Sequence, residues 1–214
     1  MRAADQEILD ARTYGPAELR GNLADLRFYG RWTGGSRLLL AEIGRLLPSR
    51  AAPPGRMTLL DVGTGSADFP LAAVRWGSRL GIEVEAHGVD TNPDVVSEAR
   101  RFLSSNRSPD GAAGRVGLIL ADARRLPYPD GSVDVVTCSN FLHHLDPDDA
   151  VRALGEAARV SRLGVVILDL RRGPISPAVI WLLTRLTTRN RLTLNDGILS
   201  ARRAFTLTEL SRLA

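Results

Sequence analysis

The stretch LLDVGTGSAD, residues 59–68, joins a hydrophobic run to a glycine-rich turn with an acid on each side. Gly63 and Gly65 let the backbone turn tightly and leave bare amides against which a ligand can lie. Asp68 stands where the dinucleotide-binding fingerprint has Gly or Ala, and its charge would repel a pyrophosphate. The turn therefore favours a ligand with a carboxylate and an ammonium group but no phosphate. The alternative is a tight turn whose acid only stabilises the next helix.

Two further acids end later apolar runs. EVEAHGVD ends on Asp90, about 25 residues beyond Gly65, near the spacing of about 20 expected for an acid that accepts hydrogen bonds from a ribose diol. GLILAD ends on Asp122, where a carboxylate beside an apolar slot could accept from the exocyclic amine of adenine. Each acid also has a simpler interpretation: Asp90 could only cap the next helix, and Asp122 could be an ordinary polar residue of a loop.

The elements that must position these acids follow a regular alternation. Short apolar runs cover residues 57–62, 82–89, 116–121, 133–138 and 163–169, and helical patterns cover 67–80, 93–105 and 147–160. This predicts an α/β fold class with a doubly wound, mostly parallel sheet that is covered on both faces. Right-handed crossovers place the carboxyl end of every strand at one edge. Asp61, Asp90 and Asp122 together then describe a nucleoside pocket without a pyrophosphate site.

Composition excludes several classes of protein. The 214 residues suit one domain with a modest appendage, and the single Cys138 fits a reducing, cytoplasmic location. All 28 basic residues are arginines, but no block is longer than a pair, so a nucleic-acid partner is not expected. The start of the chain contains acids and does not look like a signal peptide, and no apolar run approaches the roughly 18 residues of a transmembrane segment.

These motifs closely resemble those of the Rossmann-like, or class I, S-adenosylmethionine-dependent methyltransferases. DVGTGSAD matches the first motif of that family, GVD its acidic second motif, and ADARRLPYPDGSVDVV the next two. The pattern LP-x-x-DGS-x-D is typical of the branch that methylates C and O atoms of quinones and other small molecules. The resemblance runs from about residue 36 to 170. The flanks resemble, more weakly, bacterial methyltransferases of aromatic polyketide pathways, which would place the chain in secondary metabolism.

The resemblance implies S-adenosylmethionine as the cofactor and assigns its contacts. Asp61 would orient the ammonium group, and Gly63, Thr64 and Gly65 would lie against the methionine moiety. Asp90, followed by Thr91, would hold the ribose, Asp122 and Ala123 the adenine, and Asn140 the floor near the sulfonium.

Two histidines that follow the fourth strand are candidates for catalysis. His143 or His144 could act as the general base toward a phenol, although packing at the start of a helix would also explain them. Asp169, at the end of the fifth strand, could orient a histidine or cap the next loop. No metal is expected, because a catechol-type site would need an acid at the fourth strand end, where Ser139 and Asn140 stand.

The chain is expected to divide into three parts: an N-terminal helical lid (1–35), a cofactor-binding Rossmann-like domain (36–173), and substrate-lid helices with a truncated remainder of the same domain (174–214). Within them, Ser36 is predicted to cap a helix over 37–47, and residues 48–55 to form a linker. The apolar, arginine-spaced segment 174–190 fits a core-facing helix, a hydrophobic substrate port or a peripheral membrane contact.

The resemblance places a final strand hairpin after the point where this chain stops, so the C-terminal hairpin is expected to be missing. Either another element covers the fifth strand, or that strand is an open edge that another chain could pair with, as in a homodimer. The leading hypothesis is methyl transfer to an aromatic or quinoid small molecule. An RNA or protein methyltransferase and an inactive protein that only binds the cofactor are the alternatives.

Overall fold

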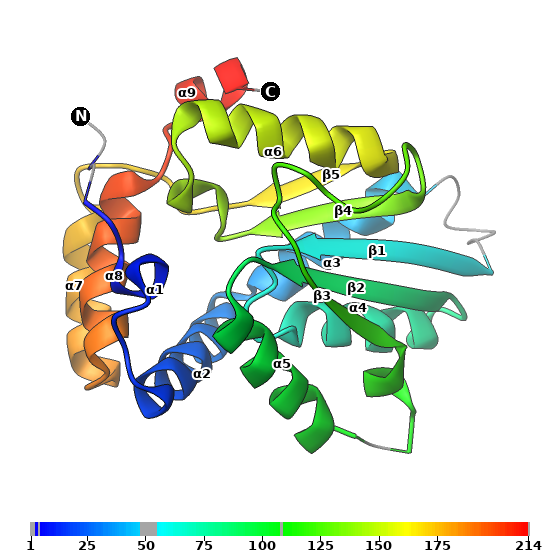
Figure 1. The fold of residues 1–214 in the computed structure, drawn as a ribbon, viewed down its shortest axis with the longest axis horizontal. Coiled ribbons are helices and arrows are strands. Elements are labelled where there is room, and N and C mark those ends of the chain that lie inside the picture. The colour runs from blue at the N-terminus through cyan, green and yellow to red at the C-terminus, as the bar shows by residue number, and fades with distance from the viewer. Residues whose placement is uncertain (1–2, 4, 48–54, 108, 214) are drawn as a thin grey trace.

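The computed structural model describes residues 3–213 except residues 4, 48–54 and 108, so most of the predicted linker lies outside the described residues. Five parallel strands form one sheet in the order β3-β2-β1-β4-β5 (Figure 1). The predicted runs lie within two residues of the observed strands, and the predicted α/β fold class is confirmed. The strands are β1 (Arg56–Val62), β2 (Glu83–Asp90), β3 (Val116–Leu120), β4 (Val133–Ser139) and β5 (Ser161–Leu168).

Helices cover both faces of the sheet because each strand carries apolar side chains on both sides. One buried cluster joins Leu59 to Ile43 of α3 and Val74 of α4, and a separate cluster joins Leu60 to Ala157 of α6. The helices of the alternating part of the chain are α3 (Gly35–Leu46), α4 (Asp68–Arg79), α5 (Pro93–Ser105) and α6 (Pro147–Val160).

The starts of these helices follow from local sequence in two cases and not in a third. The side chains of Asn92 and Asp146 accept hydrogen bonds at the starts of α5 and α6, each of which begins with a proline. The prediction that Ser36 caps α3 is wrong. Gly34, with φ +76°, ends the preceding helix α2 (Pro16–Thr33) and serves directly as the N-cap of α3, without a side-chain cap bond.

The remaining helices gather at the carboxyl ends of the strands (Figure 1). They are α1 (Ile8–Ala11), α2, α7 (Ser176–Thr187) and α8 (Arg191–Arg203), while α9 (Leu207–Leu213) packs beside α6. The carboxylate of Asp196 on α8 accepts from the backbone amides of Ile8 and Leu9 at 2.9 and 3.0 Å and so caps α1. The two predicted lid segments, from opposite ends of the chain, therefore contact each other at this edge.

Candidate functional site

The glycine-rich turn follows β1 at the point where the strand order reverses, since β2 and β4 flank β1 on its two sides. Gly63 and Gly65 both have positive φ, as the tight turn requires. The expectation of bare amides is wrong for the first two residues, because the amides of Gly63 and Thr64 donate to the carbonyl of Val89 at 2.9 and 3.0 Å. The amide of Gly65 donates to Asp90 Oδ2 at 3.4 Å. The turn is thus tied to the end of β2.

Phe141, which the sequence did not single out, lies directly against Gly63. A Cβ built on Gly63 would lie 2.5 Å from Phe141 Cδ2, and the φ of +69° adds strain for any other residue. We expect Gly63→Ala to lower the free energy of unfolding by about 2 kcal/mol, as measured by urea denaturation. Gly114→Ala is the matched control, since nothing lies within 4 Å of its added Cβ. Equal losses in the two variants would contradict the close packing of Phe141 on the turn.

Asp61, at the end of β1, is a buried carboxylate. Its Oδ1 accepts a hydrogen bond from Thr137 Oγ1 at 2.7 Å. Burial raises the pKa of Asp61 to about 7, although the hydrogen bond from Thr137 opposes the rise, and the charges of Asp68 and Asp90 add to it. Asp68 and Asp90 are therefore close enough to Asp61 to repel its negative charge. A cation placed among them would relieve this repulsion, whereas a phosphate would increase it.

Asp90, at the end of β2, is held by its neighbours and covered by the N-terminal segment. Its Oδ1 accepts from the amide of Asn92 at 2.9 Å, and burial raises its pKa. Asn92 Nδ2 in turn donates to the hydroxyl of Tyr14 at 2.7 Å, and Arg12 donates to the carbonyl of the exposed Thr91 at 3.0 Å. Residues of the predicted N-terminal lid thus lie against the predicted ribose position.

Asp122 has different bonding partners from Asp61 and Asp90. Arg124 donates from its Nε to both carboxylate oxygens at 3.0 Å and also bonds to Asp149. The side-chain hydrogen bond from Arg124 lowers the pKa of Asp122, and the side chain is 40% exposed. Ala123 beside it is buried. An adenine amine would share the Asp122 carboxylate with Arg124, a partner that the sequence interpretation did not consider.

Asn140, the predicted floor of the site, takes a left-handed backbone conformation with φ +50°, which asparagine tolerates better than most residues. Its amide donates to the carbonyl of Leu168 at 2.8 Å, so the ends of β4 and β5 are fastened together. This turn directs the chain from β4 into the short 3-10 helix η2 (Leu142–His144), which carries both histidines.

His143 and Asp169 form a buried pair. His143 Nδ1 lies 2.5 Å from Asp169 Oδ1, and the backbone amide of His143 donates to Asp169 Oδ2 at 3.1 Å. A carboxylate at Nδ1 favours the tautomer that carries its proton there, so Nε2 is the nitrogen that can accept a proton. Asp169 thus orients a histidine, one of the two alternatives that the sequence left open.

His144 has different partners, which come from the N-terminal segment. Its Nδ1 lies 3.1 Å from both oxygens of Asp10 and 3.6 Å from Glu7 Oε2. Burial disfavours the charged imidazole, but Asp10 and Glu7 outweigh this effect and raise the pKa of His144 to about 9. Burial also raises the pKa of Glu7. His144 is therefore a cation at neutral pH, which makes it unsuitable as a general base there.

The arrangement also brings together three residues of the kind that bind metals, where the sequence predicted no metal. One atom each from Glu7, His143 and His144 lies within 4.8 Å of the others. The imidazolium of His144 already balances the nearby carboxylates, and Arg203 donates to the backbone carbonyls of His143 and His144. The chain thus supplies its own positive charge here. Sequence reasoning missed Glu7 and Asp10, because their partners lie far along the chain.

The parallel sheet and the glycine-rich turn at the reversal of strand order define a Rossmann-like domain, and Asp61 and Asp90 lie at the ends of its neighbouring strands. The chain belongs to the methyltransferase domain family, whose profile matches residues 60–168. Family and fold imply S-adenosylmethionine as the methyl donor. The residues present fit this cofactor, because carboxylates at a turn that offers no phosphate-binding site suit its positively charged sulfonium and ammonium groups.

Named relatives and solved structures agree with this assignment. A ubiquinone/menaquinone biosynthesis C-methyltransferase UbiE of Methylobacterium nodulans is 34% identical over 124 residues, 58% of this chain and 44% of the relative. A demethylmenaquinone methyltransferase of Beutenbergia cavernae is 34% identical over 134 residues, 61% of this chain and 48% of the relative. The chain thus spans less than half of these curated relatives.

The structural neighbours support the fold alone, because their sequences are distant. The PH0226 protein of Pyrococcus horikoshii has a TM-score of 0.56 at 21% identity, over 72% of this chain and 61% of that one. The YcgJ protein from Bacillus subtilis has a TM-score of 0.52 at 24% identity, over 74% of this chain and 60% of that one.

Proposed function

We propose that this chain transfers the methyl group of S-adenosylmethionine to an oxygen or carbon atom of a hydrophobic aromatic or quinoid small molecule. The observation that carries the proposal is the convergence of Asp61, Asp68 and Asp90 beside the glycine-rich turn. The relatives named as quinone methyltransferases support this class of acceptor. The class is a proposal because the chain spans under half of them.

The proposed contacts with the cofactor follow the strand ends. Asp61 would accept from the ammonium group, Asp90 from the ribose hydroxyls, and the small residues of the turn would let the methionine moiety lie close. The residues proposed to line the cofactor site are Asp61, Gly63, Thr64, Gly65, Asp90, Thr91, Asp122, Ala123 and Asn140. When bound, the cofactor supplies an electrophilic methyl group on a positively charged sulfur.

The chain's own contribution is to position the acceptor, exclude water and take up a proton. Of the two histidines, His143 is the better general base, since Asp169 fixes its tautomer, whereas His144 is already protonated at neutral pH. His144 instead adds positive charge near Asp90 and holds the N-terminal segment in place. Where the acceptor is a carbon nucleophile that needs no base, His143 would only orient it.

Calorimetry with S-adenosylmethionine tests the cofactor assignment. We expect micromolar binding, weakened about 10- to 100-fold in Asp90→Asn by the loss of charge-assisted hydrogen bonds. Asp130→Asn is the control, because Asp130 is 82% exposed and pairs with Arg159 on the surface. Absence of binding to the unmodified chain would overturn the enzyme assignment.

Transfer of a labelled methyl group to a panel of acceptors tests the second half of the proposal. We expect label in a demethylated quinol or a polyhydroxylated aromatic compound and none in tRNA or protein. Label confined to RNA or to protein would show that the acceptor class is wrong while leaving the cofactor site intact.

A further inference from the structure

Helix α7 carries an apolar stripe that faces away from the protein. Ile175, Val179, Leu182 and Leu186 follow one another at intervals of four, three and four residues, and their exposed fractions are 70%, 55%, 53% and 76%. At 100° per residue these four side chains lie on one side of the helix. Monomeric soluble proteins seldom expose so many large apolar side chains in a row.

The opposite side of α7 faces α8. A Cβ built on Gly197 of α8 would lie 3.3 Å from Ile180 and 3.5 Å from Thr184, so these residues form the inner face of α7. Thr184 is the buried residue of this helix. Of the three interpretations that the sequence left open for this segment, a core-facing helix is therefore wrong for the stripe, since the apolar residues of the stripe point outward.

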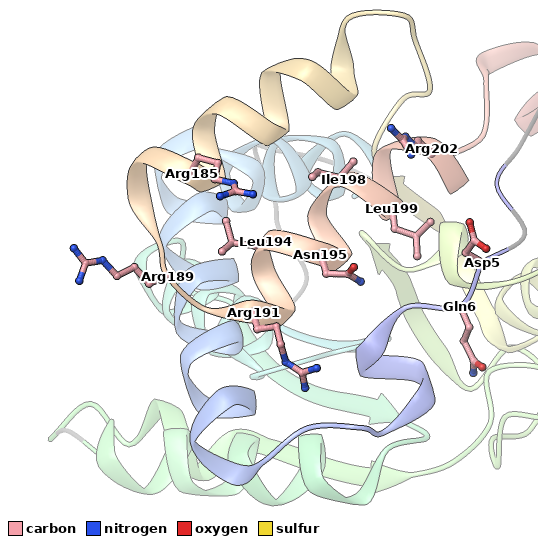
Figure 2. A pocket seen from close by; sticks show the side chains of 10 residues that line it. All are labelled: Asp5, Gln6, Arg185, Arg189, Arg191, Leu194, Asn195, Ile198, Leu199 and Arg202. Carbon is pink, nitrogen blue, oxygen red and sulfur yellow. The ribbon is translucent and has the colours of Figure 1, made fainter.

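The chain segment that carries the stripe has charges of one sign. Residues 170–195 contain five arginines and no aspartate or glutamate. A hollow of about 690 Å³ lies between the end of α7, α8 and the N-terminal segment. Its lining, drawn in Figure 2, includes Arg185, Arg189, Arg191 and Arg202, the apolar Leu194 and Ile198, and Asp5. Arg185 also lies over the ring of the half-exposed Trp181, 5.9 Å from its centroid.

We propose that the outward face of α7 docks on the surface of an anionic lipid bilayer. The apolar stripe would enter the boundary between headgroups and acyl chains, and Trp181 would lie at the headgroup level. Arg185 and Arg189 would contact lipid phosphates, because long cationic side chains extend toward the headgroups from a helix lying at the interface.

Two observations favour a bilayer over the other possible occupants. Residues 170–195 supply no acid to meet the arginines of α7, so a second copy of the same helix face would place like charges together. No helix in the described part of the chain is long and apolar enough to cross a membrane. Because its exposed apolar side chains lie along one side only, α7 matches contact in the plane of the interface. The inference does not depend on the proposed methyl acceptor.

Flotation with vesicles tests the proposal. The full chain is mixed with vesicles of phosphatidylcholine alone or with 30% phosphatidylglycerol, at low and at high salt. We expect binding to the anionic vesicles that weakens with salt. Leu182→Gln/Leu186→Gln should lower binding at least tenfold, and Arg185→Gln/Arg189→Gln should lower it about fivefold for each arginine removed.

Matched controls come from the far end of the sheet. Leu80, at the end of α4, is 49% exposed, and Arg79 beside it is exposed as well. Leu80→Gln and Arg79→Gln should leave vesicle binding unchanged. Two results would overturn the proposal: no binding of the unmodified chain to anionic vesicles, or equal losses in the control variants. A dimer in light scattering that becomes a monomer in Leu182→Gln/Leu186→Gln would assign the stripe to a second copy and overturn it as well.

Discussion

Asp61→Asn is expected to stabilise the protein while it weakens cofactor binding about 10- to 100-fold. The carboxylate of Asp61 is buried, and its pKa is raised from 3.8 to about 7, so its charge costs on the order of 2–4 kcal/mol at pH 8. Asparagine keeps the acceptor for Thr137 and removes the charge. We propose that this same charge attracts the ammonium group of the cofactor.

The sign of the pH dependence makes this prediction specific. A carboxylate with a raised pKa destabilises the fold increasingly as pH rises from about 4 to 7, so Asp61→Asn should differ little from the unmodified chain at pH 4 and most at pH 8. Urea denaturation at several pH values measures the difference. Cofactor affinity of the unmodified chain should fall as pH drops below about 7, and calorimetry should show no such fall in Asp61→Asn. A variant that is less stable at pH 8 would contradict this account.

His144→Gln is expected to release the N-terminal segment. The substitution leaves the buried Glu7 and the partly buried Asp10 without their cation, and breaking a buried pair of this kind costs about 3 kcal/mol. Protection of the amides of Ile8 and Leu9 against hydrogen exchange should fall about 100-fold at pH 7, relative to their intrinsic exchange rates. His87→Gln is the control, since His87 pairs with Tyr128 away from this segment.

The pH dependence again has a defined direction. The pKa of His144 is raised from 6.5 to about 9, so its stabilising contribution is full below about 6.5 and is lost as pH rises through about 9. The unmodified chain should therefore lose protection in residues 8–14 at alkaline pH. His144→Gln should lack this transition, and its persistence in that variant would assign the effect to another group.

The sheet could be predicted from the sequence because its signal is local. Each strand is a short apolar run bounded by turn residues, and parallel strands must place their carboxyl ends at one edge. That rule alone predicts that Asp61 and Asp90 lie at the same edge of the sheet. It did not reveal that Arg124, two residues after Asp122, would engage that carboxylate, although the pair was visible in the sequence.

The distinction between the two histidines could not be predicted, because it depends on residues far away in the chain. His143 and His144 are adjacent, yet one pairs with Asp169 and the other with Asp10, which is 134 residues away. No periodicity links the N-terminal acids to the fourth strand. The exposed stripe on α7 was equally ambiguous, since its apolar pattern fits a buried face until the position of α8 is known.

The cap that Asp196 provides for α1 joins positions 188 residues apart, and the bond from Ser200 to Glu7 spans 193. During synthesis, residues 7–9 therefore cannot meet these partners until the chain has been made as far as residue 200. Contacts of such sequence separation form late, because the loop-closure entropy must be overcome first. The sheet can thus assemble before its cover, and a chain shortened before α8 would leave α1 without the cap from Asp196.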